Sequence, residues 1–147
     1  ERLNNLNKQR QNIEETVLFE AINNIESNII NKKLNIIPNS LIVSGENWHL
    51  GVLGIVASRL KDKYYRPSFV LSFSEGKFTG SARSISGIDI GKLIIKAVNK
   101  NLLLSGGGHK MAAGFSLNDD TFDDFKEFCE EEIYLQSNNS TLNKINY

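Results

Sequence analysis

The sequence predicts an α/β fold: a mixed central sheet of about five strands, flanked by helices and preceded by a long helix. Three observations lead to this prediction. Residues 2–33 contain neither proline nor glycine and repeat apolar side chains at helical spacing. Short β-prone segments then alternate with helix-like segments over residues 41–133. Glycine, proline and serine lie between these segments, as turns between elements require.

The first helix is expected over about residues 2–33. Its apolar stripe recurs every three or four residues and consists of Leu3, Leu6, Ile13, Val17, Leu18, Ile22, Ile25 and Ile29. Asparagine is abundant and lowers helix propensity, so the early turns are expected to depend on contacts outside this fragment. A helix packed on its own domain and a linker or coiled-coil arm both fit, and the uneven stripe favours a linker. A linker would leave Leu3 and Leu6 exposed.

The later elements follow from local patterns. Strands are expected over residues 41–45, 68–73, 77–83 and 112–117. A loop runs into a helix within residues 48–60, where Gly51 and Gly54 suggest close approach by another backbone or a ligand. Asp89 is a good N-cap for a helix to about Lys100.

Asn118 or Asp119 is expected to cap a last helix, whose apolar stripe is Phe122, Phe125, Cys129 and Ile133. The predicted organisation is therefore a connector helix over residues 1–37, a domain over 38–135 and a loose tail over 136–147.

The composition is that of one globular domain with a helical extension: 147 residues, 40% hydrophobic and 23% charged. No apolar run is long enough to span a bilayer, and no signal peptide is evident. The single cysteine, Cys129, excludes an internal disulfide and fits a reducing, cytoplasmic setting. Its helical surroundings predict a buried, inert thiol. The chain begins at Glu1 without methionine, and we interpret it as part of a longer polypeptide.

The net charge of zero conceals an uneven distribution. Residues 46–114 carry ten Lys or Arg against four Asp or Glu, whereas residues 115–147 carry two against eight. A basic middle segment beside an acidic helix fits a phosphate or nucleic-acid site next to a solvated helix. A solvated, charge-balanced surface would show the same distribution.

The glycine run at residues 106–108 is the first candidate site. It is followed at once by His109 and Lys110, and glycine allows the backbone to lie close to a ligand. Exposed N–H groups beside a polar side chain can cradle a phosphate. A flexible turn between two strands, with a merely structural His109, fits the spacing equally well.

Two further candidates lie earlier in the chain. Ser81 and Arg83 are two residues apart, so on a strand they point to one face, where a guanidinium and a hydroxyl suit a pair of phosphate oxygens. An edge strand with polar residues facing water is the alternative. His49 precedes a helix, where free backbone N–H groups favour anions, but a lone loop histidine is more often without function.

Four stretches together resemble the RecJ family, which comprises bacterial exonucleases specific for single-stranded DNA. They are residues 49–60, Arg66-Pro67, residues 80–84 and residues 107–114, in the family's order and spacing. The resemblance is to the family's DHH-associated (DHHA1-type) domain and covers residues 41–133, and the helix before it resembles the family's connector. Ala82 departs from the pattern, because many relatives carry glycine there.

The resemblance implies a five-prime to three-prime exonuclease that hydrolyses phosphodiesters with metal ions, in DNA repair and recombination. It implies manganese or magnesium in a DHH catalytic domain of the same polypeptide, whose motifs this sequence lacks. No catalytic or metal-binding residue is therefore assigned here, and the isolated fragment is predicted to be inactive. The oligonucleotide-binding domain that usually follows is also absent from this sequence.

The resemblance also implies roles for individual residues. Ser81 and Arg83 resemble the family's grip on the terminal five-prime phosphate, and Gly107, Gly108 and His109 resemble its contacts beside the scissile phosphate. His49 is expected near the same face, with a less defined role. The implied partners are single-stranded DNA and the catalytic domain, with no membrane, in a cytoplasmic protein that is expected to be a monomer.

Two alternatives remain open at this point. One is a DHH-type phosphoesterase for short oligonucleotides or cyclic dinucleotides, which shares a Gly-Gly-His-type motif. The other is a stand-alone nucleic-acid-binding module. The segments at residues 51–59 and 80–84 favour the RecJ family over the first, and an Asp-His-His motif upstream of Glu1 would decide the enzyme class.

Overall fold

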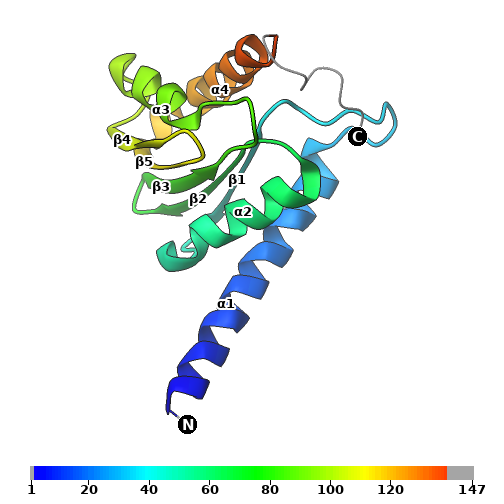
Figure 1. Ribbon diagram of the computed structural model, residues 1–147. Coiled ribbons are helices and arrows are strands. Elements are labelled where there is room, and N and C mark those ends of the chain that lie inside the picture. The colour runs from blue at the N-terminus through cyan, green and yellow to red at the C-terminus, as the bar shows by residue number, and fades with distance from the viewer. Residues whose placement is uncertain (1, 139–147) are drawn as a thin grey trace.

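A computed structural model describes residues 2–138, with side chains from residue 7 onward (Figure 1). The elements in chain order are α1 (Arg2–Asn24), η1 (Ile25–Ile29), β1 (Leu41–Glu46), η2 (Leu50–Val52), α2 (Leu53–Tyr64), β2 (Ser68–Ser74), β3 (Lys77–Arg83), α3 (Ile90–Asn99), β4 (Ser105–His109), β5 (Ala112–Asn118), η3 (Asp119–Thr121) and α4 (Phe122–Ser137). The predicted α/β fold is confirmed, and β4 is the strand that the sequence did not predict.

The five strands form one mixed sheet in the order β1-β2-β3-β5-β4. Strands β1 and β2 are parallel, and the other three pairings are antiparallel. Helices α3 and α4 pack on one face of the sheet, and α2 packs on the other with α1 beside it (Figure 1). A separate apolar cluster lies on each face.

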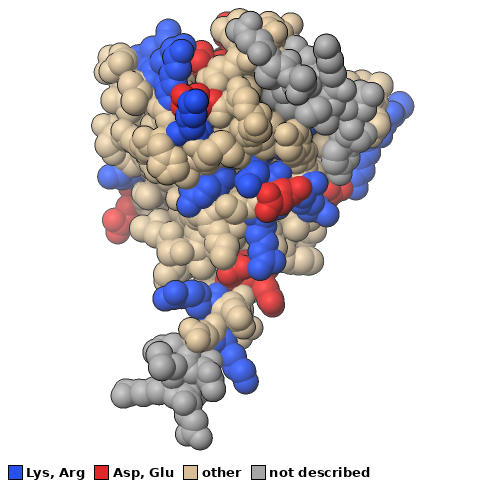
Figure 2. Space-filling view, viewed as in Figure 1, with Lys and Arg blue, Asp and Glu red and all other residues tan. Residues whose placement is uncertain are grey.

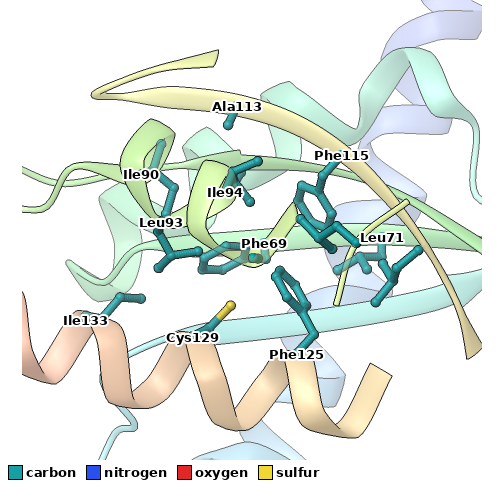
Figure 3. Close-up of a cluster of buried hydrophobic side chains, with 14 of the residues drawn as sticks. Phe69, Leu71, Ile90, Leu93, Ile94, Ala113, Phe115, Phe125, Cys129 and Ile133 are labelled. Atoms are coloured by element: carbon teal, nitrogen blue, oxygen red, sulfur yellow. The ribbon is translucent and has the colours of Figure 1, made fainter. Parts of the chain in front are cut away.

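The larger cluster, between the sheet and helices α3 and α4, is rich in aromatic rings (Figure 3). Phe125 of α4 is fully buried, and its ring centroid lies 6.0 Å from that of Phe69 and 5.3 Å from that of Phe115. Cys129 lies one helical turn further on and is fully buried. Burial raises the pKa of this thiol well above its ordinary value, so the predicted inert thiol is confirmed.

Helix α1 is buried over only part of its length. Val17, Ala21 and Ile25 are buried against the domain, whereas residues 7–12 are exposed. The predicted exposure of Leu3 and Leu6 concerns side chains that lie outside the described residues. The uneven stripe therefore reflects a helix whose second half belongs to the domain and whose first half projects from it (Figure 1).

Three carboxylates of α1 and η1 bind polar groups of the domain. Glu14 pairs with Arg59 of α2 at 3.1 Å. Glu20 accepts a hydrogen bond of 3.0 Å from the Trp48 indole, and Glu26 accepts one of 2.6 Å from the Tyr64 hydroxyl. Two of these contacts hold the N-terminal helix against α2, and the Trp48 contact holds it against the loop that carries His49.

Some boundaries differ from those predicted. The first helix was expected to reach Lys33 but ends with a π-helical turn at Ile29, because Ile30 donates back to the Ile25 carbonyl and the chain then turns. Asn118 and Asp119 do not cap α4, because the 3₁₀ turn η3 lies between them and that helix. The N-cap residue of α4 is Thr121.

The last helix also extends into the predicted tail, because it ends at Ser137. Gln136, expected to be loose, is held in place: its side chain accepts a hydrogen bond of 2.7 Å from the Asp89 backbone N–H. The rest of the predicted tail, from residue 139, lies outside the described residues.

The Arg66-Pro67 motif has a structural role. Arg66 is buried, and its guanidinium donates to the backbone carbonyls of Pro38 and Tyr65. Burial lowers the pKa of Arg66, and the nearby Glu130 carboxylate opposes that shift. Glu130 in turn accepts hydrogen bonds from the Asn39 and Ser40 backbone N–H groups. The motif thus fixes the start of β1 against α4 and lies apart from the candidate site.

Candidate functional site

Strand β3 presents different residues to the two faces of the sheet. Phe78 and Ala82 are buried in the α3–α4 cluster. Ser81 pairs with Val70 of β2, which belongs to the α1–α2 cluster, so Ser81 and Arg83 face the α2 side. The structure thus places Ser81 and Arg83 on one face, as their spacing predicts.

The Arg83 side chain lies against the first turn of α2. Its guanidinium donates a hydrogen bond of 2.8 Å to the Ala82 carbonyl, which fixes its direction. A Cβ atom at Gly54 would lie 3.2 Å from Arg83 Cζ and closer still to Nη2, so the guanidinium in this position lies directly against Gly54. The group close to Gly54 is therefore a side chain, and not the backbone or ligand that the sequence suggested.

This arrangement favours an anion. Among the described residues, Arg83 forms no salt bridge, so its charge is available to a ligand. The first turn of α2 adds the positive end of the helix dipole. A cation and a helix N-terminus therefore meet at one point of the sheet.

The glycine run is a strand. Residues 105–109 form β4, which pairs antiparallel with β5 and is exposed along its whole length. The sequence predicts no strand here, because three glycines have low strand propensity. Pairing with β5 and support from α3 outweigh that propensity: a Cβ at Gly91 of α3 would lie 2.8 Å from the His109 carbonyl oxygen.

Strand pairing brings the separate motifs into register. Arg83 is opposite Ala112, and Ala112 is opposite His109. Directly opposed residues point to the same face, so Arg83 and His109 share the α2 side about 10 Å apart, which is two strand spacings. A second row runs from Ser81 through Gly114 to Gly107. We call the surface formed by these two rows the open floor.

The glycines of this region fall into two groups. A Cβ at Gly106 would lie 2.6 Å from Ile94 Cγ2, and one at Gly108 would lie 2.6 Å from Ala113 Cα. These two are glycines because the packing leaves no room. By contrast, a Cβ at Gly107 would have no neighbour within 4 Å, and one at Gly114 would lie 3.8 Å from its nearest atom. The Gly107 and Gly114 positions therefore leave the open floor uncovered.

His49 does not join these rows. It begins η2, and its Nδ1 atom accepts a hydrogen bond of 2.9 Å from the Gly51 backbone N–H. Its ring lines two cavities of about 480 and 310 Å³ against α1, and neither is lined by Ser81, Arg83 or β4. The expectation that His49 lies near the Arg83 face therefore finds no support in these contacts.

The charges around α2 have a mixed pattern. Figure 2 shows Lys and Arg side chains gathered across the middle of this view, over α2, with a few carboxylates among them. The contributors on α2 are Arg59, Lys61 and Lys63, with Asp62 between them. Arg59 and Lys61 are paired with carboxylates, which leaves this surface moderately basic.

The described residues do not suit a metal ion. Over residues 2–138, no group of three or more His, Cys, Asp or Glu side chains is placed to hold one. The acidic residues of α4 act elsewhere, since Glu132 pairs with Lys96 and Glu130 binds the start of β1. In the same range, no helix combines the length and apolar character that a membrane crossing needs.

Comparison with known proteins adds a family to this geometry. The model of the DHHA1 domain family matches residues 16–134. The single-stranded-DNA-specific exonuclease RecJ of Haemophilus influenzae is 38% identical over 136 residues, which are 89% of this chain and 23% of the relative. The chain thus spans less than a quarter of the length of the curated relative.

A solved RecJ structure also resembles this chain. The crystal structure of Thermus thermophilus RecJ in complex with Mn²⁺ matches 91% of this chain and 18% of its own, with a TM-score of 0.74 and 31% identity. A pGpG-specific phosphodiesterase of Vibrio matches 88% of this chain and 43% of its own, with a TM-score of 0.53. At 14% identity, that second likeness shows the fold alone.

Proposed function

The chain belongs to the DHHA1 domain family, and on that premise we propose that it is the substrate-binding domain of a RecJ-like single-stranded-DNA exonuclease. In this proposal the complete enzyme degrades DNA from the five-prime end, in the cytoplasm, during repair and recombination. Hydrolysis belongs to a DHH catalytic domain of the same polypeptide, which holds manganese or magnesium. The residues described here do not form such a metal site.

The observation that carries the proposal is the placement of Arg83. Its guanidinium is fixed by the Ala82 carbonyl, forms no salt bridge among residues 2–138 and lies at the N-terminus of α2. A planar guanidinium binds two phosphate oxygens at once, and the positive end of the α2 dipole strengthens the attraction. Arg83 therefore binds the five-prime phosphate of the strand.

Ser81 lies two residues before Arg83 on β3 and adds a hydroxyl to the same face. A hydroxyl donates to a phosphate oxygen without adding charge, so it orients the group that Arg83 attracts. The strand then crosses the open floor over Gly114 and Gly107, where no side chain separates it from the backbone. His109 lies at the far end, where the phosphate to be cleaved faces the catalytic domain.

The role assigned to Gly108 changes in this account. Its missing side chain makes room for Ala112 and Ala113, so Gly108 shapes the hairpin between β4 and β5. Gly107 and His109 remain the positions of β4 that a nucleic acid can approach on this face.

A titration with labelled DNA tests the proposal. Fluorescence anisotropy should show that the chain binds a five-prime phosphorylated single strand more tightly than the same sequence as a blunt duplex. Arg83→Ala should weaken binding about ten- to hundredfold, since a charged hydrogen-bonded contact contributes roughly 1.5–3 kcal/mol.

Lys77→Ala is the matched control, because Lys77 begins the same strand and is exposed at the opposite end. If the two variants lose equal affinity, Arg83 is only part of a basic surface. Competition with unlabelled pGpG tests the dinucleotide alternative. If pGpG displaces the labelled strand at a far lower concentration than an unlabelled longer oligonucleotide does, a RecJ-like substrate is contradicted. With manganese present, the purified chain alone should release no mononucleotides.

A further inference from the structure

A cavity of about 340 Å³ lies beside the turn of the β4–β5 hairpin. Its lining residues are Ser86, Gly87, Ile88, Asp89, Lys110 and Met111. We propose that this turn cavity holds the base of the first nucleotide of the bound strand. The inference rests on the proposed function, because it takes the five-prime phosphate to be bound at Arg83.

The turn cavity lies next to the Arg83 row. Arg83 is opposite Ala112, and Met111 is the residue before Ala112. Ser84, the residue after Arg83, donates a hydrogen bond of 2.9 Å to the Met111 carbonyl. Along the backbone, the cavity therefore begins one residue beyond the row that contains Arg83. A base is joined to the five-prime phosphate through a single sugar, so an adjacent cavity is within its reach.

The lining suits a flat, partly polar ring. Ile88 is buried and supplies an apolar floor, and Met111 is 43% exposed and supplies a thioether, which packs well against aromatic rings. Lys110 forms no ion pair among the described residues, so its ammonium is available to the ring or to an adjacent oxygen. Polar side chains beside an apolar floor can fix the orientation of a small ligand.

The same lining predicts tolerance of base identity. Asp89 is already engaged, because its Oδ1 atom accepts a hydrogen bond of 3.0 Å from the Lys92 backbone N–H. The remaining polar side chains, those of Ser86 and Lys110, are exposed, and a hydroxyl and an ammonium can meet different base edges. An exonuclease that removes each nucleotide in turn needs this tolerance.

The cavity is formed before any ligand binds. The Ser84 hydroxyl is buried and donates to the Ile88 and Ile85 carbonyls, at 2.6 and 3.2 Å. Ile90 at the start of α3 donates a hydrogen bond of 2.9 Å to the Lys110 carbonyl. The loop and the turn are therefore held against each other, and a bound base need not order them.

The test removes the base from the DNA strand and the thioether from the protein. Anisotropy titrations would compare a five-prime phosphorylated oligothymidine with the same strand carrying an abasic first nucleotide. The chain should bind the abasic strand about three- to tenfold more weakly. Met111→Ala should bind both strands alike, at the affinity of the chain for the abasic strand.

Leu104→Ala is the matched control, because Leu104 is an exposed apolar residue just before β4 and does not line the cavity. It should keep the full difference between the strands. Thermal melting checks that each variant is folded, and Lys110→Ala provides a second variant with the same expected direction.

Two results would overturn the base site. One is that Met111→Ala weakens both strands by the same factor. The other is that an abasic second nucleotide, and not an abasic first one, lowers affinity. The proposed function fails separately, if the chain binds no strand or if Arg83→Ala binds the intact phosphorylated strand as tightly as the unchanged chain.

Discussion

The two faces of strands β3 and β5 serve different purposes. On the α3–α4 face, Phe78, Ala82 and Phe115 are buried in an aromatic core. On the α2 face, the alternate residues Ser81, Arg83 and Gly114 leave much of the surface open, because α2 covers β2 and β3 but not β4. A strand can therefore supply stability with one set of residues and binding with the next.

This comparison predicts how substitutions divide. Changes on the α3–α4 face should reduce stability, and any effect on binding should follow from unfolding. Changes on the open floor should alter binding while the free energy of unfolding stays nearly constant. Each prediction below tests that division, and the expected effects decrease from one to the next.

Phe125→Ala should cause the largest loss of stability. The ring is fully buried between Phe69 and Phe115, so its removal leaves a cavity that the neighbours cannot fill. We expect the free energy of unfolding to fall by about 3–5 kcal/mol in a urea titration. A loss below about 1 kcal/mol would mean that the α3–α4 cluster is not the main core.

Adjacent glycines of β4 should respond in opposite ways. Gly108→Ala forces a Cβ against Ala112 and Ala113 and should cost roughly 1–3 kcal/mol of stability. Gly107→Ala meets open space, so its stability should change by less than about 0.5 kcal/mol while DNA affinity falls. Equal thermal melting curves for the two variants would contradict the division of the glycines.

The smallest effect concerns the covered part of the α2 face, where α1 is bound. The hydrogen bond from Tyr64 holds the pKa of Glu26 below its ordinary value of 4.5. A depressed folded-state pKa stabilises the protein above the unfolded pKa, and this stabilisation is lost as the pH falls through the folded value.

Glu26→Gln should therefore be slightly less stable than the unchanged chain at pH 7. The difference should shrink as the pH falls below about 4.5. Urea midpoints measured from pH 7 to pH 3 check this expectation. A difference that stays constant over that range would show that the carboxylate charge contributes nothing at this contact.

Much of this division could be read from the sequence. Alternation along residues 77–83 gave β3 with its bounds, and Asp89 was correctly identified as the N-cap of α3. The spacing of Ser81 and Arg83 also placed them on one face. These features depend on local chemistry, which a short segment contains completely.

Other features depend on contacts between distant segments. Strand β4 was not predicted, because glycines have no strand signal of their own and the strand exists through its pairing with β5. The sequence predicts a ligand contact at Gly108, and only the positions of Ala112 and Ala113 show that a side chain has no room there. His49 lies against α1, and this position likewise depends on how that distant helix packs on the domain.

The central claim is that Arg83 binds a five-prime phosphate at the edge of the open floor. The most direct measurement compares Arg83→Ala with the unchanged chain on two strands that differ only in a five-prime phosphate or hydroxyl. The account predicts that the unchanged chain prefers the phosphate and that the variant loses this preference, with Arg83→Lys restoring only part of it. An equal loss on both strands, with a changed salt dependence, would contradict the claim and reduce Arg83 to a general basic contact.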